Sequence, residues 1–371
     1  MTGPAGDALP EGRDPYDLYG AADSAGDAGA RYSEHVRRKK LILIAGFALL
    51  AAMVLAASCM GAIRIPAADV FRYIILFDDG GMGRIVWGVR LPRIIACVLV
   101  GAGLAVSGAV MQCVLRNHLA SPYTLGISGA AAFGASFAII FLQAGSGASS
   151  SVSVSNPYVV TLCAFAFSLA ATGAVLLLAR VAGASAEAMV LAGIAISAMA
   201  AAGLSFMQYI ATDSQLANIV SWSFGDMGRA TWRWNLMVLA VLAPSALYFA
   251  YRRWDYNAMD SGEETAKGLG VNTGRERMIG MVLASLASSV IVSFFGIVAF
   301  IGLLGPHIAR MILGSDHRFL IPGAMIFGAA MLLASDKVGM AVLSPAVVPV
   351  GIITSALGGP LFIYLLVRRR G

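Results

Sequence analysis

Charged residues are scarce in this chain: they make up 12% of the 371 residues, against 58% hydrophobic residues, and the mean hydropathy is +0.79. This composition excludes an ordinary soluble globular domain. The apolar runs are continuous and about 20 residues long, enough to cross a ~30 Å hydrocarbon core as helix, so a barrel of short alternating strands is excluded too. Many of the 42 glycines lie inside these runs, where small residues let helices approach closely. We therefore expect an all-α polytopic membrane protein with a compact helix bundle.

Residues that carry catalysis or bind metals are also few. The four cysteines lie in or beside apolar runs without a disulfide or metal-binding spacing, and the four histidines are scattered. The chain lacks the GxxxxGK[ST] loop that cradles nucleotide phosphates, and it shows no nucleophile paired with a base. We expect neither an enzyme nor an ATPase, and no cofactor or metal. The net charge of +6 does not indicate nucleic-acid binding, because the basic residues cluster beside apolar runs.

Ten apolar segments are predicted to form the membrane domain. They cover residues 41–62, 91–115, 125–143, 157–180, 188–211, 233–251, 277–297, 298–313, 319–335 and 349–368. The first is too long and too far inside the chain for a cleaved signal peptide. The eighth is short and interrupted by Gly302, Gly305 and Pro306, which indicates a broken or half-crossing segment. The polar residues 1–36 are predicted to be a disordered cytoplasmic tail, and residues 37–371 a ten-span membrane domain.

Basic residues predict the orientation of the bundle. An even number of spans puts both termini on one side, and that side collects the larger group of Lys and Arg, as cytoplasmic loops do. This group comprises Arg37, Arg38, Lys39, Lys40, Arg116, Arg180, Arg252, Arg253, Lys267, Arg275, Arg277, Arg310, Arg318 and Arg368 to Arg370. The opposite side holds a sizeable minority of the basic residues, and some of these could bind a partner outside the cell membrane. We expect a multi-pass protein of the cytoplasmic membrane with both termini in the cytoplasm.

Ionisable residues are nearly missing from the centres of the predicted spans, although pumps driven by protons or sodium usually need them there. Gln112 and Gln208 are polar but cannot cycle a proton. Energy for uphill transport would therefore come from another subunit, and a secondary transporter or channel is the alternative. In the loop 252–277, residues Glu263 to Lys267 predict a short helix that stops at Gly268 or Gly270. That helix is either a docking surface or an ordinary solvated connector.

Six motifs in order along the chain resemble the FecCD family, the membrane permeases of binding-protein-dependent ABC importers for iron-siderophores, haem and vitamin B12. They are RLPR at Arg90 to Arg93, GAGLAVSGAVMQ at Gly101 to Gln112, RNHLASPYTLGISGAAAFGA at Arg116 to Ala135, GLG at Gly268 to Gly270, FFGIVAFIGLLGPHIAR at Phe294 to Arg310, and PVGIITSALGGPLFIYLL at Pro349 to Leu366. The resemblance implies a type II ABC importer permease with ten spans. It also implies a second permease subunit, identical or not, two cytoplasmic ATP-binding subunits and an extracytoplasmic binding protein. An iron-siderophore is the first substrate expected, then haem, then cobalamin.

The resemblance also implies roles for individual residues. For docking of the binding protein it indicates Arg90 and Arg93, with Lys337 as a substitute charge; anchoring at the membrane interface is the alternative for the two arginines. For the translocation pathway and its gate the candidates are Ser107, Gln112, Asn117, Leu119, Gly193 and Ser197, with Gly101 and Gly103 as further small residues. For coupling to the ATPase the resemblance implies Glu263, Ala266, Gly268, Leu269, Gly270 and Val271.

Three positions depart from the family pattern. His118 stands where the family usually has proline, and a lone histidine at a membrane boundary is more readily a polar turn residue than a haem or iron ligand. Met340 and Val347 stand where an arginine and an acidic residue are common. These two changes put a second external docking patch in question.

Overall fold

The computed structural model describes residues 25–61, 65–76, 81–144, 156–183 and 185–368, and every regular element in these ranges is a helix. The helices are α1 (Ala25–Cys59), α2 (Ala67–Leu76), α3 (Gly81–Ile85), η1 (Val86–Arg90), α4 (Leu91–Val114), α5 (Ile127–Phe141), α6 (Pro157–Val181), α7 (Ala186–Ile210), α8 (Asp213–Ser223), η2 (Met227–Arg229), α9 (Trp232–Tyr251), α10 (Arg253–Asp260), α11 (Glu263–Gly268), α12 (Thr273–Phe295), α13 (Ile301–Leu313), α14 (His317–Val342) and α15 (Val350–Arg368).

Each of the ten apolar segments predicted from the sequence contains a helix. Seven helical stretches are long and apolar enough to cross a membrane: α1, the continuous stretch from α3 to α4, α6, α7, α9, α12 and α14. The other three segments form the shorter apolar helices α5, α13 and α15. Helix α13 has 13 residues, which at ~1.5 Å per residue is less than a full crossing. The non-helical residues 296–300 before it are mostly buried, and irregular backbone inside a membrane is tolerated when protein covers it.

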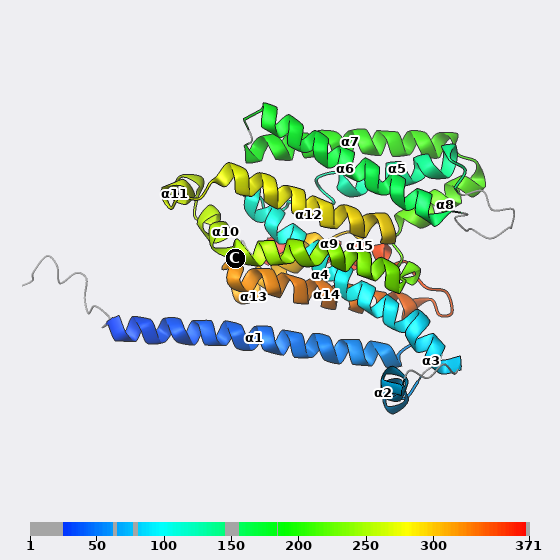
Figure 1. The fold of residues 1–371 in the computed structure, drawn as a ribbon, viewed down its shortest axis with the longest axis horizontal. Coiled ribbons are helices and arrows are strands. Elements are labelled where there is room, and N and C mark those ends of the chain that lie inside the picture. The colour runs from blue at the N-terminus through cyan, green and yellow to red at the C-terminus, as the bar shows by residue number, and fades with distance from the viewer. Residues whose placement is uncertain (1–24, 62–64, 77–80, 145–155, 184, 369–371) are drawn as a thin grey trace, which may run out of the picture.

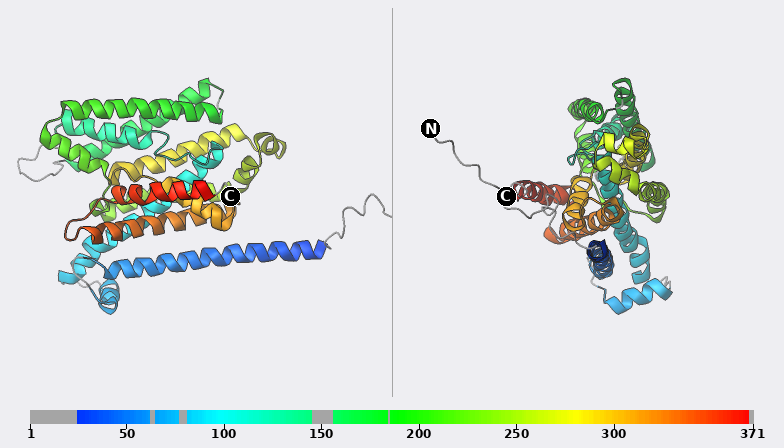
Figure 2. Two further views of the ribbon diagram at one scale, coloured as in Figure 1. Left: turned by 180° about the vertical axis from the view of Figure 1, so that it is seen from behind. Right: turned by 90° about the vertical axis from the view of Figure 1, so that its left-hand side faces the viewer.

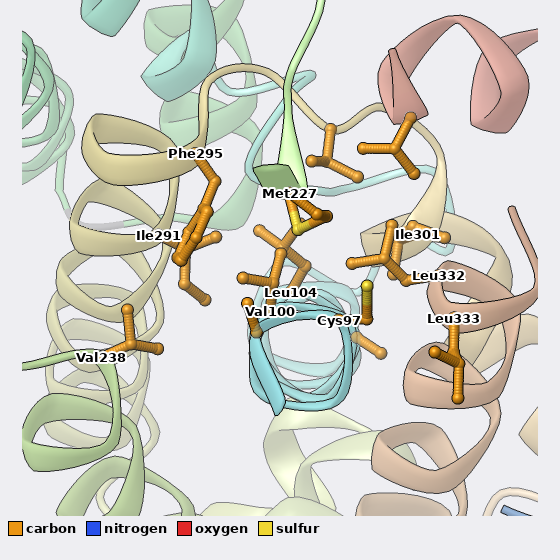
Figure 3. Packing of buried hydrophobic residues seen from close by; sticks show 14 of the residues in the cluster. Cys97, Val100, Leu104, Met227, Val238, Ile291, Phe295, Ile301, Leu332 and Leu333 are labelled. Carbon is orange, nitrogen blue, oxygen red and sulfur yellow. The ribbon is translucent and has the colours of Figure 1, made fainter. Parts of the chain in front are cut away.

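Helix α4 forms the centre of the bundle. It packs against α9, α12, α13 and α14, and most of its side chains from Ile94 onward are buried. Figure 3 shows α4 side chains such as Val100 and Leu104 surrounded by Ile291 of α12, Ile301 of α13 and Leu332 of α14. Helices α5 to α8 form a second group on one side, whereas α1 runs along the opposite edge against α14 (Figure 1).

Glycines let two neighbours of α4 come unusually close. A Cβ on Gly108 would lie 1.7 Å from the carbonyl oxygen of Gly302 in α13, and a Cβ on Gly101 would lie 2.4 Å from that of Gly328 in α14. No side chain fits at these distances. The backbones therefore touch directly, as expected for small residues at interfaces between membrane helices.

The two ends of the bundle differ in their connections (Figures 1 and 2). Helices α10 and α11 lie at one end, which we call the α11 end, together with the start of α1 and the C-terminal end of α15; α2 and α3 lie at the other, the α2 end. The start of α1 contacts that of α14, since Arg318 donates to the hydroxyl of Tyr32 at 2.9 Å and Lys39 lies over the ring of Phe319. Most of the basic residues assigned from the sequence to the cytoplasmic side belong to helix ends or connections at the α11 end. They include Arg116, Arg180, Arg252, Lys267, Arg310 and Arg318.

Some boundaries and elements differ from those predicted. Helix α1 begins at Ala25, so the tail boundary at residue 36 is wrong for residues 25–36, which extend the first span as helix. Residues 1–24 lie outside the described residues. Helices α2, α8 and α10 were not predicted. A signal for α8 was present, because Thr212 and Gln215 form a capping box at its start.

Candidate transport and coupling sites

Arg93, at the α2 end of α4, forms a buried ion pair with Asp336 of α14. Its Nη2 lies 2.8 Å and its Nε 3.0 Å from Oδ1 of Asp336. The exposed fraction is 12% for the Arg93 side chain and 1% for that of Asp336. The fork of the guanidinium matches the geometry of the carboxylate. Each charge is stabilised by the other at a place where little water is available to solvate it. The pair therefore fastens α4 to α14.

Arg90 is also buried and turned into the chain. Its Nη1 donates to the carbonyl oxygen of Ser58, near the end of α1, at 2.8 Å. The structure thus brings Arg90 and Arg93 together at one end of α4 but engages both of them within the chain. Their role in docking a binding protein stays a prediction.

Lys337 lines a groove at the α2 end. Its Nζ lies 3.5 Å from Oδ2 of Asp336 and donates to the sulfur of Met340 at 3.6 Å. The groove has a volume of about 940 Å³ and is lined by Cys59, Met60, Gly61, Ile65, Pro66, Lys337, Met340, Ala341, Ser344, Pro345 and Val347. Both Met340 and Val347, which depart from the family pattern, therefore lie on the same groove as Lys337.

The turn after α4 is held by its own polar groups. The side chain of Asn117 accepts from the backbone N–H of Leu119 at 2.9 Å, and the hydroxyl of Thr124 accepts from the N–H of Ser121 at 2.9 Å. Half of the Leu119 side chain is exposed. His118 is an exposed residue of this turn, as expected for a polar turn position.

Helix α7 packs directly onto the end of this turn. Ser197 donates to the carbonyl oxygen of Thr124 at 3.4 Å. A Cβ on Gly193 would lie 2.7 Å from the side chain of Leu125, so the small residue permits the contact. The predicted pathway residues of α7 thus lie against the segment that contains Asn117 and Leu119.

Two other predicted pathway residues lie inside the bundle. Ser107 is fully buried, and Gln112 is buried between α4 and α13. The side-chain oxygen of Gln112 accepts from Arg310 at 3.1 Å, and its amide donates to the carbonyl oxygen of Leu303 at 3.5 Å. Neither residue lines an open surface of the isolated chain, and their contribution to a pathway stays a prediction.

The short helix predicted in the loop 252–277 is confirmed as α11. Ala266 is fully buried and anchors the helix, whereas Leu269, directly after it, is 70% exposed. Gly270 has φ +83, a left-handed conformation that favours glycine and ends the helix as predicted. The loop therefore presents an apolar side chain at a fixed position, which suits docking better than a solvated connector would.

Arg277 joins α11 to the last turn of α4. Its Nη2 lies 3.1 Å from Oε2 of Glu263, at the start of α11, and its Nε donates to the carbonyl oxygen of Val114 at 2.9 Å. The arginine is 3% exposed. The hydrogen bond from Arg277 lowers the pKa of Glu263, so this carboxylate stays charged in the contact. Val114 is the last residue of α4, so only Leu115 and Arg116 separate this link from the predicted gate residues Asn117 to Leu119.

A second buried carboxylate fastens α12 to α9 nearby. Glu276 accepts from Tyr248 at 3.0 Å and from the Nε of Arg252 at 3.1 Å. Arg252 and Arg277 were expected from the sequence to be loop charges only. The pair Glu276 and Arg277 at the start of an apolar run is a signal of such contacts, because charged side chains buried there require partners.

Known proteins match the chain over most of its length. The model of the FecCD transport family matches residues 49–368. The "Putative ABC transporter permease protein" of Methanocaldococcus jannaschii is 46% identical over 346 residues, covering 92% of this chain and 98% of the relative. The Hemin transport system permease protein HmuU of Yersinia pestis is 34% identical over 335 residues, with coverages of 88% and 96%. The Vitamin B12 import system permease protein BtuC of Escherichia coli is 35% identical over 285 residues, with coverages of 77% and 84%.

A solved structure matches as well. The one titled "An inward-facing conformation of a putative metal-chelate type ABC transporter" superimposes with a TM-score of 0.77 at 28% identity, covering 89% of this chain and 99% of that one. The fold is thus that of a type II ABC importer permease. The chain belongs to the FecCD transport family and is an integral-membrane permease of the ABC importer type.

Proposed function

We propose that the chain translocates an iron-siderophore complex across the cytoplasmic membrane, driven by ATP hydrolysis on separate subunits. The basic residues at the α11 end support a cytoplasmic position for that end and for both termini. Haem and cobalamin are the next substrate candidates, and relatives named for hemin and for vitamin B12 support this range of large ligands.

The observation that carries the proposal is the link from α11 through Arg277 to α4. An ATP-binding subunit would dock on α11 around the exposed Leu269. Closure of two such subunits on ATP would move α11, and Glu263 would transmit this displacement to Arg277 and to Val114. The proposed gate at Asn117 to Leu119 begins three residues after Val114. ATP would in this way bias a two-state change between outward and inward access.

A second permease subunit, identical or different, would complete the pathway. In this arrangement Leu119 and Ser197 would face the partner across the pathway, and small residues such as Gly193 would let a large ligand pass without tight binding. The extracytoplasmic binding protein would dock at the α2 end, where Arg90, Arg93 and Lys337 supply positive charge. Substrate recognition would then lie mainly in the binding protein.

Reconstitution in liposomes tests the proposal. The chain, its ATP-binding subunit and its loaded binding protein should together import ferric siderophore only with ATP inside, at the side of the ATPase. Import by the purified chain alone, or import that follows an ion gradient without ATP, would instead establish a secondary transporter or channel. Haem and cobalamin serve as competing ligands, and binding to the external protein identifies the substrate.

A further inference from the structure

Three side chains that are far apart in the sequence meet at the α11 end. Cys113 is on the last turn of α4, Asp260 is the last residue of α10, and His317 is the first residue of α14. One potential ligand atom from each lies within 4.8 Å of the other two, and Nε2 of His317 lies 3.0 Å from Oδ2 of Asp260. Cys113 and His317 are buried, whereas a quarter of the Asp260 side chain is exposed. The cluster is therefore an enclosed site with one side open to solvent.

We propose that Cys113, Asp260 and His317 bind a divalent cation of the zinc class. Zinc takes sulfur, imidazole nitrogen and carboxylate oxygen at roughly 2.0–2.3 Å, which places neighbouring ligand atoms of a tetrahedral site roughly 3.3–3.7 Å apart. A spread of at most 4.8 Å needs only a small contraction to reach that geometry. Thiolate and imidazole disfavour magnesium and calcium, which prefer oxygen ligands. The open side at Asp260 gives the cation an entry path and leaves room for water as a fourth ligand.

The surroundings hold the three ligands in position. The backbone N–H of His317 donates to the side chain of Asn257 at 2.7 Å, and the Asn257 amide donates to Asp316 at 3.0 Å. The thiol of Cys113 lies 3.5 Å from the carbonyl oxygen of Tyr256. The Nδ1 of His317 is buried and has no hydrogen-bond partner in the described part of the chain. The protein therefore engages only one of the two ring nitrogens, Nε2.

Two positive charges, those of Arg310 and Arg277, lie close enough to the ligands to oppose a cation at this place. Arg310 lies near enough to Asp260 to act on its carboxylate, but one of its nitrogens, Nη1, donates to Gln112 at 3.1 Å. Thiolate and carboxylate together would bring two negative charges to the site, which compensate the cation. In the absence of metal the same three groups form a hydrogen-bonded cluster, which is the alternative that the test must separate.

Bound metal would restrain the coupling region, an effect that rests on the proposed function. Only residues 261–262 separate α10 from α11. A cation that joins Asp260 to α4 and α14 would therefore limit the movement of α11 relative to the bundle. Divalent metal on this side would slow ATP-driven transport, which makes the site a feedback device for a metal-importing system.

Co²⁺ binding to the purified full chain tests the site independently of any ATPase. The chain is purified with an affinity tag that contains no histidine. We expect one Co²⁺ per chain, a thiolate-to-cobalt absorption band in the near ultraviolet, and displacement by Zn²⁺. Cys113→Ser should remove the band, and Asp260→Asn and His317→Gln should weaken binding at least about tenfold. The matched control is Cys97→Ser, on the same helix but outside the cluster, which should keep both band and affinity.

The proposal would be overturned by wild-type protein that binds no Co²⁺ or Zn²⁺ at micromolar concentration, or by a thiolate band that survives Cys113→Ser. Asp260→Asn is the variant least expected to misfold, because the side chain of Asp260 is the exposed one of the three and the buried Cys113 and His317 stay in place. A variant that elutes as a monodisperse protein and keeps wild-type affinity would equally contradict the assignment. Loss of ATP coupling in the reconstituted importer would leave this binding result untouched.

Discussion

The Nε of Arg277 lies 2.9 Å from the carbonyl oxygen of Val114, the last residue of α4. A helix leaves its final carbonyl groups without intrahelical partners, and here a buried guanidinium from α12 satisfies one of them. Because the same guanidinium also donates to Glu263, the end of a central span and the start of α11 contact one side chain. Under the proposed function, a movement of α11 would act on α4 through this contact.

Gly108→Ala should destabilise the bundle severely. The new Cβ would lie 1.7 Å from the carbonyl oxygen of Gly302, so α4 and α13 would have to separate. We expect a loss of several kcal/mol, at the upper end of effects of single substitutions. Thermal unfolding in detergent measures it. Gly173→Ala, in helix α6 with open space around its Cβ, is the control and should be neutral or slightly stabilising. Equal behaviour of the two variants would contradict the packing described here.

Arg93→Met should cost more stability than the double change Arg93→Met with Asp336→Leu. The single variant leaves the buried carboxylate of Asp336 with only Lys337, 3.5 Å away, as a counter-charge, at a cost of up to about 3–5 kcal/mol, whereas the double change removes both charges of the Arg93–Asp336 pair. Unfolding midpoints of the single and double variants give the coupling. Additive effects of the two changes would show that the pair does not form.

Asp316 should contribute stability that disappears only in strong acid. Burial opposes its ionisation, but hydrogen bonds from Arg318 and Asn257 outweigh that effect and lower its pKa to about 2. Since the folded-state pKa is depressed, the contribution is complete above the unfolded-state pKa of about 3.9 and is lost as the pH falls through about 2.

Comparison of wild type with Asp316→Asn isolates the contribution of the Asp316 charge to stability, because asparagine keeps a helix-capping side chain but carries no charge. The difference in unfolding temperature should be constant from pH 7 to about pH 4 and shrink toward pH 2. A difference that vanished already near pH 6 would refute the assignment.

Gly270→Pro should abolish substrate-stimulated ATP hydrolysis while leaving membrane insertion intact. Proline fixes φ near −65°, whereas Gly270 has φ +83, so the end of α11 and the position of Leu269 would change. Gly274→Ala, in the first turn of α12, is the control and should keep normal stimulation, because its φ is not positive and its Cβ would make only an ordinary contact, 3.7 Å from the side chain of Asn272. Normal stimulation in the proline variant would mean that α11 is not the coupling element.

The sequence predicted the local elements well and the long-range contacts poorly. Apolar runs located the seven helices of spanning length and the three shorter apolar helices, and acidic residues followed by glycine located α11, because these signals are contained in consecutive residues. The pairing of Arg93 with Asp336 joins residues 243 positions apart. No spacing rule connects such residues, so Arg93 was assigned to a surface role that its burial makes less direct.

The convergence of Cys113, Asp260 and His317 could not be predicted from the sequence for the same reason. Each residue taken alone reads as a core thiol, a loop acid or a scattered histidine, and only the packing of α4, α10 and α14 brings them together. Helix α10 itself was not predicted, because its few residues carry charges and no long apolar run.

Substrate-stimulated ATP hydrolysis by the reconstituted importer with Arg277→Met tests the central claim most directly. The exposed Arg275→Met, two positions away on the same helix, is the matched control. We expect basal hydrolysis to continue in both variants. Stimulation and transport should fall at least about tenfold in Arg277→Met, because the side chain that joins Glu263 to the carbonyl oxygen of Val114 is removed. Arg275→Met should behave as wild type. Full stimulation and transport in a folded Arg277→Met importer would contradict the account.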